Sequence, residues 1–246
     1  MRLSQEHRQE SIWNSSAPRN YGLRSLTVSG WGSVTTEHRR LVLSPEGFRR
    51  YDESADTLFY NQPRFVKHID DAAVAAVTQL YRELFPADGC ILDLMSSWVS
   101  HLPVEARYRR VVGLGLNEQE LAANPRLDAF VVQDVNAESH LPFESMEFDG
   151  AAICVSVQYL TDPVAVLREV GRVMHPGAPL VITFSNRCFP TKAVAIWHAL
   201  DDAGHGQLVT DYMRAAGNWT DIRFLDRSPS QQATDPLFAV VARAQL

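Results

Sequence analysis

Residues 90–116 read CILDLMSSWVSHLPVEARYRRVVGLGL and contain two short apolar runs, at 90–94 and 110–116. Apolar runs of this length are typical of strands buried on both faces of a parallel sheet. This stretch therefore predicts the first two strands of an α/β sheet.

Further strands and helices alternate on both sides of this stretch. The spacing of apolar residues predicts a helix over 70–84, which Pro86 and Gly89 would end. Asn117 and Asp162 are good N-caps for two later helices. Additional helical patterns cover 195–200 and 208–213, and five more strand-like runs lie at 130–134, 149–156, 179–185, 221–226 and 237–244.

This alternation predicts an α/β fold with a doubly wound, mostly parallel sheet of seven strands. A short loop separates the last two strands, which predicts an antiparallel hairpin at the C-terminus. Sheets of this kind bind ligands beyond the carboxyl ends of their strands, where the strand order reverses. Glu120, three residues after Asn117, has the spacing of a capping box, in which its side chain would return to the cap.

Residues 1–57 differ from the rest, because they are polar and irregular with isolated aromatic residues such as Trp31. We expect an N-terminal extension over 1–57 and the folded domain over 58–246. The carboxyl ends of the strands, where the ligand site is expected, need a cover that excludes water. The extension is therefore interpreted as a lid or as an arm across a dimer. A surface extension without that role is the alternative.

The composition narrows the range of functions. The net charge of -6 argues against a nucleic-acid partner. The three cysteines are far apart, and no spacing suggests a metal site. The N-terminus lacks a signal-peptide pattern, and no apolar run is long enough to cross a membrane. We therefore expect a cytoplasmic protein that acts on a small molecule.

Several motifs at the strand ends have a family pattern. Asp134-Val135 follows the third predicted strand, and Leu141-Pro142-Phe143 and Phe148-Asp149 come next. The segment Arg168–Gly177 reads REVGRVMHPG. Together they resemble the class I S-adenosylmethionine-dependent methyltransferases, especially the small-molecule group called type 11. The resemblance covers roughly residues 58–185 and implies a Rossmann-like fold, S-adenosylmethionine as cofactor and S-adenosylhomocysteine as product.

The resemblance also implies a set of cofactor-binding residues. Asp93 matches the acid of the first motif, but Met95, Ser97 and Val99 stand where the family has glycines. Asp134 would accept from the adenine amino group, beside the apolar Val135. The other candidates lie at the same strand ends or just before the first helix: Tyr60, Arg64, Ser96, Gly115, Leu116, Asn117 and Ser156.

Three of these positions carry an open interpretation. Gly115 stands where the family has an acid for the ribose hydroxyls, so Asn117 is the candidate substitute, or else only a helix cap. Arg64 would hold the methionine carboxylate, with a hydrogen bond from Tyr60, unless it is a surface arginine. Asp93 could equally be a buried structural residue.

The acceptor is expected beside the fourth and fifth strands. The catalytic candidates are Tyr159, His101 and His68, the histidines as bases. Asn186, Arg187 and Lys192 are further pocket candidates. The predicted reaction moves a methyl group to a nitrogen or oxygen atom by in-line displacement, for which positioning matters most.

Two other functions stay open on the sequence alone. A nicotinamide-dependent oxidoreductase would need GxGxxG, and Gly113-Leu114-Gly115 is followed by Glu118 at the third glycine position. A non-catalytic binding or scaffold protein would explain the missing glycines and the missing ribose acid. The expected partner is a small-molecule acceptor, without nucleic acid or membrane, and the chain is a possible homodimer.

Overall fold

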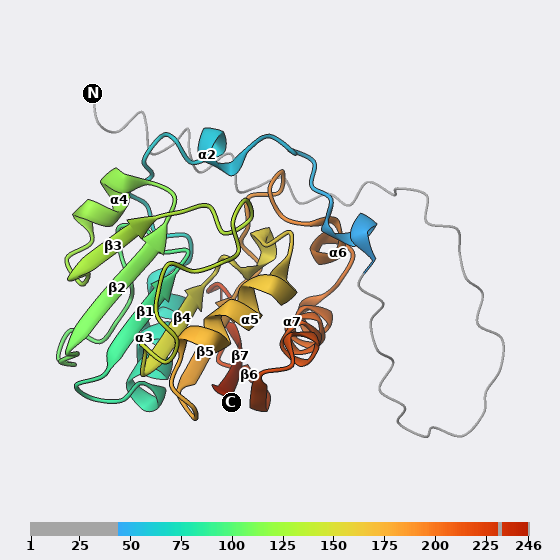
Figure 1. Ribbon diagram of the computed structural model, residues 1–246. Helices are drawn as coiled ribbons and strands as arrows, with labels where there is room; N and C mark the ends of the chain where they lie inside the picture. The colour runs from blue at the N-terminus through green and yellow to red at the C-terminus, as the bar shows by residue number, and fades with distance from the viewer. Residues whose placement is uncertain (1–43, 231–232, 246) are drawn as a thin grey trace, which may run out of the picture. The chain divides into compact units, whose positions relative to one another are not determined.

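A computed structural model describes residues 44–230 and 233–245, so the predictions on residues 1–43 lie outside it (Figure 1). The described chain forms a seven-stranded sheet with strand order β3-β2-β1-β4-β5-β7-β6. Strands β1 to β5 pair in parallel, and β7 runs antiparallel between β5 and β6. The predicted fold class is confirmed, including the C-terminal antiparallel hairpin.

The strands are short and lie within one or a few residues of their predicted positions. Their bounds are β1 Cys90–Leu94, β2 Arg110–Gly115, β3 Ala129–Val132, β4 Gly150–Cys154, β5 Pro179–Phe184, β6 Trp219–Asp226 and β7 Phe238–Ala244. β1 and β5 are almost wholly buried, whereas the edge strand β3 alternates between exposed and half-buried residues. The strand order reverses between β1 and β4, which places the switch point at their carboxyl ends.

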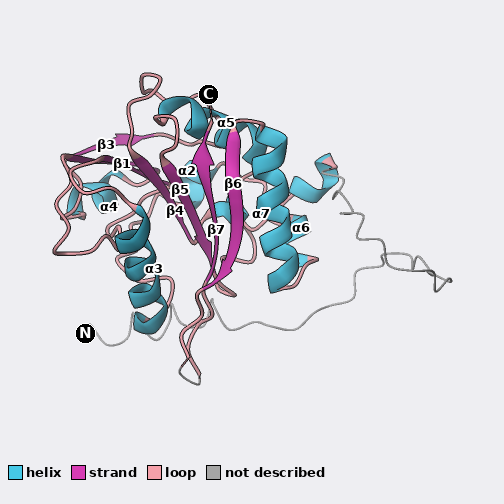
Figure 2. Cartoon of the chain, turned by 90° about the horizontal axis from the view of Figure 1, so that it is seen from below, coloured by secondary structure: helices cyan, strands magenta, loops and turns pink. Residues whose placement is uncertain are grey.

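Helices cover both faces of the sheet, as Figure 2 shows for α3 on one side and α7 on the other. Their bounds, with η for 3-10 helices, are η1 Pro45–Phe48, α2 Asp56–Phe59, α3 Asp71–Leu84, α4 Glu118–Ala123, η2 Val157–Tyr159, α5 Pro163–Val173, α6 Ala195–His198 and α7 Asp202–Ala216. Within the described residues, no helix combines the length and the apolar character needed to span a bilayer.

Local capping signals explain where the longer helices begin. The Asp70 side chain accepts from the Ala73 amide at the start of α3, and Asp162 does the same for Ala165 at the start of α5. Asn117 caps α4 by accepting from the Glu120 amide, as predicted. The predicted capping box is wrong, however, because the Glu120 side chain accepts from Ser97 and Arg64 instead.

The connection from β1 to β2 departs from the predicted alternation, because residues 95–109 contain no helix. Met95 begins this turn with φ +56°, a left-handed conformation that favours glycine. The Ser96 amide then donates to the Leu114 carbonyl at 2.8 Å, so the turn continues alongside β2. Asn124, just beyond α4, donates to the Ser97 carbonyl and to Ser100 Oγ. The turn is therefore anchored to β2 and α4.

The glycines of β2 have packing roles. A Cβ on Gly113 would collide with the Leu127 side chain, and one on Gly115 would collide with the Ser96 carbonyl oxygen. Both glycines lie inside the strand rather than in a turn that follows it. They are thus accounted for by close approach within the protein, which removes the sequence support for a dinucleotide fingerprint.

An N-terminal strap, defined here as residues 44–60, runs across the carboxyl ends of the strands (Figure 1). At one end the Ala195 amide donates to the Arg49 carbonyl, and at the other end Asn117 Nδ2 donates to the Tyr60 carbonyl. Arg50 forms an almost fully buried ion pair with Asp56 at 2.8 Å. Residues 44–57 are therefore packed on the domain, whereas the rest of the predicted extension lies outside the described residues.

We expect Gly115→Ala to destabilise the domain by roughly 1–3 kcal/mol, because the new methyl group meets a backbone oxygen that β2 itself holds in place. Urea unfolding at constant pH measures the change. Gly47→Ala is the matched control, since its Cβ would lie 3.4 Å from Ile196, an ordinary contact. Equal stabilities for the two variants would contradict the close approach.

Candidate functional site

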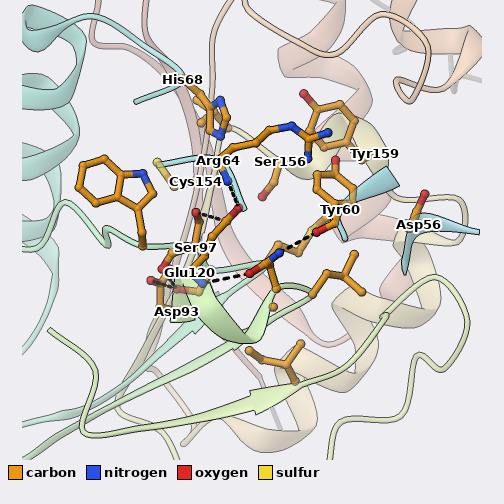
Figure 3. A pocket seen from close by; sticks show the side chains of 18 of the residues that line it. Asp56, Tyr60, Arg64, His68, Asp93, Ser97, Glu120, Cys154, Ser156 and Tyr159 are labelled. Carbon is orange, nitrogen blue, oxygen red and sulfur yellow. Dashed lines mark hydrogen bonds between the residues drawn. The ribbon is translucent and has the colours of Figure 1, made fainter. Parts of the chain in front are cut away.

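One pocket opens at the carboxyl ends of β1, β2 and β4, at the switch point of the sheet (Figure 3). Every cofactor-binding and catalytic candidate from the sequence lines it. The structure adds residues that the sequence analysis did not select: Asp56, Val66, Lys67, Trp98, Val99, Leu114, Glu120, Gln133, Asn136, Cys154, Val155 and Phe189. The three catalytic candidates and the proposed cofactor ligands thus share a single cavity.

Asp93 lies at the floor of this pocket, where β1 ends. It is 4% exposed and accepts a hydrogen bond from Ser96 Oγ at 2.6 Å. Burial raises the pKa of its carboxyl to about 6, because desolvation outweighs the hydrogen bonds from Ser100 and Ser96. The predicted acid is therefore present, in a setting that disfavours its charge.

Both side-chain donors of Asn117 are used within the protein. Its Oδ1 accepts from the Glu120 amide, and its Nδ2 donates to the carbonyls of Tyr60 and Asn61. An amide nitrogen has only two protons to donate, so none is left for a ligand. Asn117 is the helix cap and also holds the end of the N-terminal strap, which weakens its case as the ribose ligand.

Glu120 is the pocket residue whose position the sequence analysis did not anticipate. It is 8% exposed, and its two carboxylate oxygens accept from Ser97 Oγ at 2.5 Å and from the Arg64 amide at 2.6 Å (Figure 3). Its spacing from Asn117 was the available signal, but that spacing indicated a capping box. Only the pairing of the β1 turn with β2 brings Ser97 within reach.

Arg64 crosses the pocket with its guanidinium surrounded by aromatic rings. The guanidinium carbon lies 4.7 Å from the Phe59 ring centroid and 5.4 Å from that of Phe189. Nη2 donates to the Phe59 carbonyl, whereas Nη1 is buried with no hydrogen-bond partner. A buried donor of this kind is costly unless a ligand accepts from it. The sequence interpretation of Arg64 as an anion-binding residue fits this geometry.

Asp134 occupies the loop after β3, with Val135 buried beside it. Its Oδ1 accepts from the Asn136 amide at 2.9 Å, which fixes the loop and leaves Oδ2 without a protein donor among the described contacts. Asn136 in turn donates to Asp56 Oδ2 and to the Tyr159 carbonyl. The loop that carries Asp134 is therefore tied directly to the N-terminal strap.

His68 and His101 both line the pocket in their neutral forms. Burial lowers the pKa of each to about 4, with smaller contributions from Arg64 to His68 and from Lys67 to His101. The His68 ring packs 5.5 Å from the centroid of Phe189. Both imidazoles can accept a proton at neutral pH, as a base must.

Tyr159 and Ser156 differ in how the protein uses them. The Tyr159 hydroxyl accepts from the Phe189 amide at 2.8 Å, and burial raises its pKa far above the ordinary value. Tyr159 therefore keeps its proton and is unsuited to be a base, although it can position a ligand. Ser156 Oγ is buried in the pocket wall with no hydrogen-bond partner.

The three further candidates do not line the pocket. Arg187 pairs with Asp235 at 2.8 Å, on the side of α3. Lys192 is fully buried and contacts Asp56 at 3.2 Å as well as the carbonyls of Asp52 and Ser54. Lys192 thus holds the N-terminal strap in place, and its expected role at the acceptor is wrong.

The described residues contain no group of three or more His, Cys, Asp or Glu side chains placed to hold a metal ion. The three cysteines are free thiols, and burial raises the pKa of Cys154 to about 11. The polar groups in the pocket lining are carboxylates, hydroxyls, imidazoles, side-chain amides, one guanidinium and one ammonium group.

Comparison with known proteins points to a methyltransferase domain. Residues 89–182 match the family model described as a methyltransferase domain. Demethylmenaquinone methyltransferases from two strains of Mycobacterium are 30% identical over 148 residues, which is 58% of this chain. The match spans 60% of the length of these relatives.

Solved structures show the same fold at low identity. The [4+2]-cyclase SpnF gives a TM-score of 0.54 at 16% identity and covers 77% of this chain and 92% of its own. Phosphoethanolamine N-methyltransferase 2 from Haemonchus contortus, in complex with S-adenosylmethionine, gives 0.51 at 13% identity and covers 70% and 52%. The described residues thus have the fold of these solved structures. Together with the match of residues 89–182 to a methyltransferase domain, this supports the predicted resemblance to type 11-like S-adenosylmethionine-dependent methyltransferases.

We expect the raised pKa of Asp93 to make the free energy of unfolding depend on pH. Its folded pKa of about 6 lies above the ordinary value of 3.8, so the folded state binds more protons than the unfolded state between these two pKa values. Its contribution to the free energy of unfolding therefore falls as the pH rises from about 4 to 6, by up to ~3 kcal/mol.

Asp93→Asn removes this contribution while it keeps an oxygen for Ser96 and Ser100. Urea unfolding of both proteins from pH 4 to pH 7 measures the difference, in which the other titrating groups cancel. The variant should gain stability relative to the wild type as the pH rises. If the free energies of unfolding of the two proteins changed in parallel with pH, the pKa of Asp93 would not be raised by folding.

Proposed function

We propose that this protein transfers a methyl group from S-adenosylmethionine to a small-molecule acceptor. The observation that carries the proposal is that one acceptor and one donor, each with an unused hydrogen-bonding atom, line the same pocket. Asp134 has a free carboxylate oxygen next to β3, and Arg64 has an unpartnered buried N–H next to the N-terminal strap. The cofactor carries an adenine amino group at one end and a carboxylate at the other.

The polar groups along the pocket fit such a molecule. Val135 supplies an apolar contact beside Asp134, as an adenine ring requires. Ser156 Oγ is a second buried polar atom without a partner, and Tyr60 lies beside Arg64, with ring and guanidinium 5.6 Å apart. When bound, the cofactor would supply an activated methyl group on a sulfonium. The protein supplies the orientation and the exclusion of water.

The chain would promote in-line displacement by holding the acceptor against this methyl group. Tyr159 and Phe189 form one wall, with ring centroids 6.0 Å apart, and the neutral imidazoles of His68 and His101 lie in the same pocket. An oxygen acceptor would lose its proton to one of these imidazoles, whereas an amine can react in its neutral form. We retain a nitrogen or oxygen acceptor in this proposal.

A carbon acceptor is the variant that experiments must include. The mycobacterial relatives are named for demethylmenaquinone, so a quinone-like ring is one acceptor to test. The proposal extends to a small molecule as the partner, without nucleic acid or membrane, in a cytoplasmic chain. The role of residues 1–57 as a lid or dimer arm is supported only for residues 44–57, through Asp56 in the pocket lining.

A non-catalytic binding protein is the second candidate, and two observations favour it. Met95 adopts a left-handed conformation where the family has glycine, and the side chain of Asn117 has no free donor. Such a protein could bind an adenosyl compound without turning it over. Calorimetry with S-adenosylhomocysteine and a turnover assay on a panel of phenols, amines and quinones separate the two candidates.

We expect Asp134→Ala to weaken S-adenosylhomocysteine binding by ~1–3 kcal/mol, the usual cost of a lost hydrogen bond to a charged group. Isothermal calorimetry measures the affinity. Glu138→Ala on the same loop is the control, because Glu138 is exposed and outside the pocket lining, and among the described residues its side chain accepts only from the exposed His140 amide. This variant should bind normally. An unchanged affinity for Asp134→Ala would remove this residue from the site.

We expect the rate of an oxygen-methylating reaction to depend on one of the pocket histidines. With a pKa of about 4, either base would be active above about pH 5, and the rate should be flat from there to neutral pH. His68→Gln or His101→Gln should lower kcat by about 10²-fold or more at pH 7. His175→Gln, at the other end of the sheet, is the control. Full turnover in both pocket variants would exclude a histidine base.

A further inference from the structure

Glu120 is a buried carboxylate without a cationic partner. It is 8% exposed, and no lysine, arginine or histidine among the described residues forms an ion pair with it. Asp56, in contrast, is paired with both Arg50 and Lys192. A buried carboxylate with only neutral donors is expensive for the fold, unless a ligand adds further donors.

Both oxygens of Glu120 retain the capacity to accept more hydrogen bonds. Ser97 Oγ donates to Oε2 and the Arg64 amide donates to Oε1, so each oxygen has one protein donor. A carboxylate has about four acceptor positions. The two protein contacts thus fix the orientation of the group within the pocket lining and leave acceptor positions open on both oxygens (Figure 3).

The strand end next to Glu120 cannot carry a carboxylate of its own. Any side chain at Gly115 would collide with the Ser96 carbonyl, which is held by the pairing of the β1 turn with β2. Asn117 has already used its donors on the N-terminal strap. Glu120 is therefore the acidic group that this part of the pocket presents to a ligand.

We infer that Glu120 binds the vicinal hydroxyls of the cofactor ribose, an inference that rests on the proposed function. The cofactor offers donors at its adenine amino group, at the two ribose hydroxyls and at its ammonium. With the adenine at Asp134 and the carboxylate at Arg64, as proposed, the ribose would lie between these two residues. Glu120 is in the same pocket lining and accepts from the Arg64 amide. Two adjacent hydroxyls match the two oxygens of one carboxylate, with one hydrogen bond to each.

The test combines a change in the protein with a change in the ligand. Calorimetry measures the affinity of the wild type, Glu120→Gln and the exposed control Glu118→Gln for S-adenosylhomocysteine and for its 2′-deoxy and 3′-deoxy analogues. Glu120→Gln should bind S-adenosylhomocysteine about 10- to 100-fold more weakly, and Glu118→Gln should resemble the wild type. The preference of the wild type for the intact ribose should largely disappear in Glu120→Gln.

Each outcome points to one conclusion. If the wild type does not bind S-adenosylhomocysteine at all, the proposed function fails. If it binds but Glu120→Gln binds equally well, or keeps the same preference over the deoxy analogues, only the role of Glu120 is overturned. The wild-type comparison does not depend on the folding of any variant: equal affinity for all three ligands also overturns the inference. Ser97→Ala removes a neighbour of Glu120 but keeps the carboxylate, so it should retain the preference.

Discussion

The shape of the pocket depends on the contact between the Ser96 carbonyl and the backbone of Gly115. This contact exists because the turn after β1 continues to pair with β2 instead of entering a helix. Only glycine allows two backbones to come this close. The same turn includes backbone strain at Met95, which adopts a left-handed conformation although it is not glycine. The floor of the site is therefore set by backbone packing before any ligand is considered.

Helix α4 and the residue that follows it anchor the turn after β1, which contains no helix of its own. Asn124, just after α4, holds the Ser97 carbonyl and Ser100, whereas Glu120 in its first turn holds the Ser97 hydroxyl and the Arg64 amide. Asn117 at its start holds the strap through the Tyr60 carbonyl. One short helix thus joins the β1 turn and the N-terminal strap, and the pocket lies where the three meet.

The sequence predicts those features that depend on local spacing. The strands appear as apolar runs, and Asp70, Asn117 and Asp162 cap helices because the bonds they form span three residues. The burial of Lys192 and the position of the Glu120 side chain could not be predicted, because their partners are 140 and 23 residues away, respectively. A lysine near a strand end indicates a ligand site only if no other part of the fold binds its ammonium group. Here the carboxylates and carbonyls of the N-terminal strap bind the ammonium group of Lys192.

The buried carboxylates that line the pocket differ in whether a cationic side chain compensates their charge. Burial alone would raise the pKa of Asp56, but hydrogen bonds from Arg50 and Asn136 outweigh this effect and lower it, so its charge is compensated within the fold. Asp93 and Glu120 have hydroxyl and amide donors but no cationic partner. S-adenosylmethionine carries a sulfonium charge that S-adenosylhomocysteine lacks. Carboxylates without a cationic partner would attract the sulfonium form more strongly than the neutral thioether of the product, whereas the Arg64 guanidinium and the Lys67 ammonium group in the same lining would act in the opposite direction.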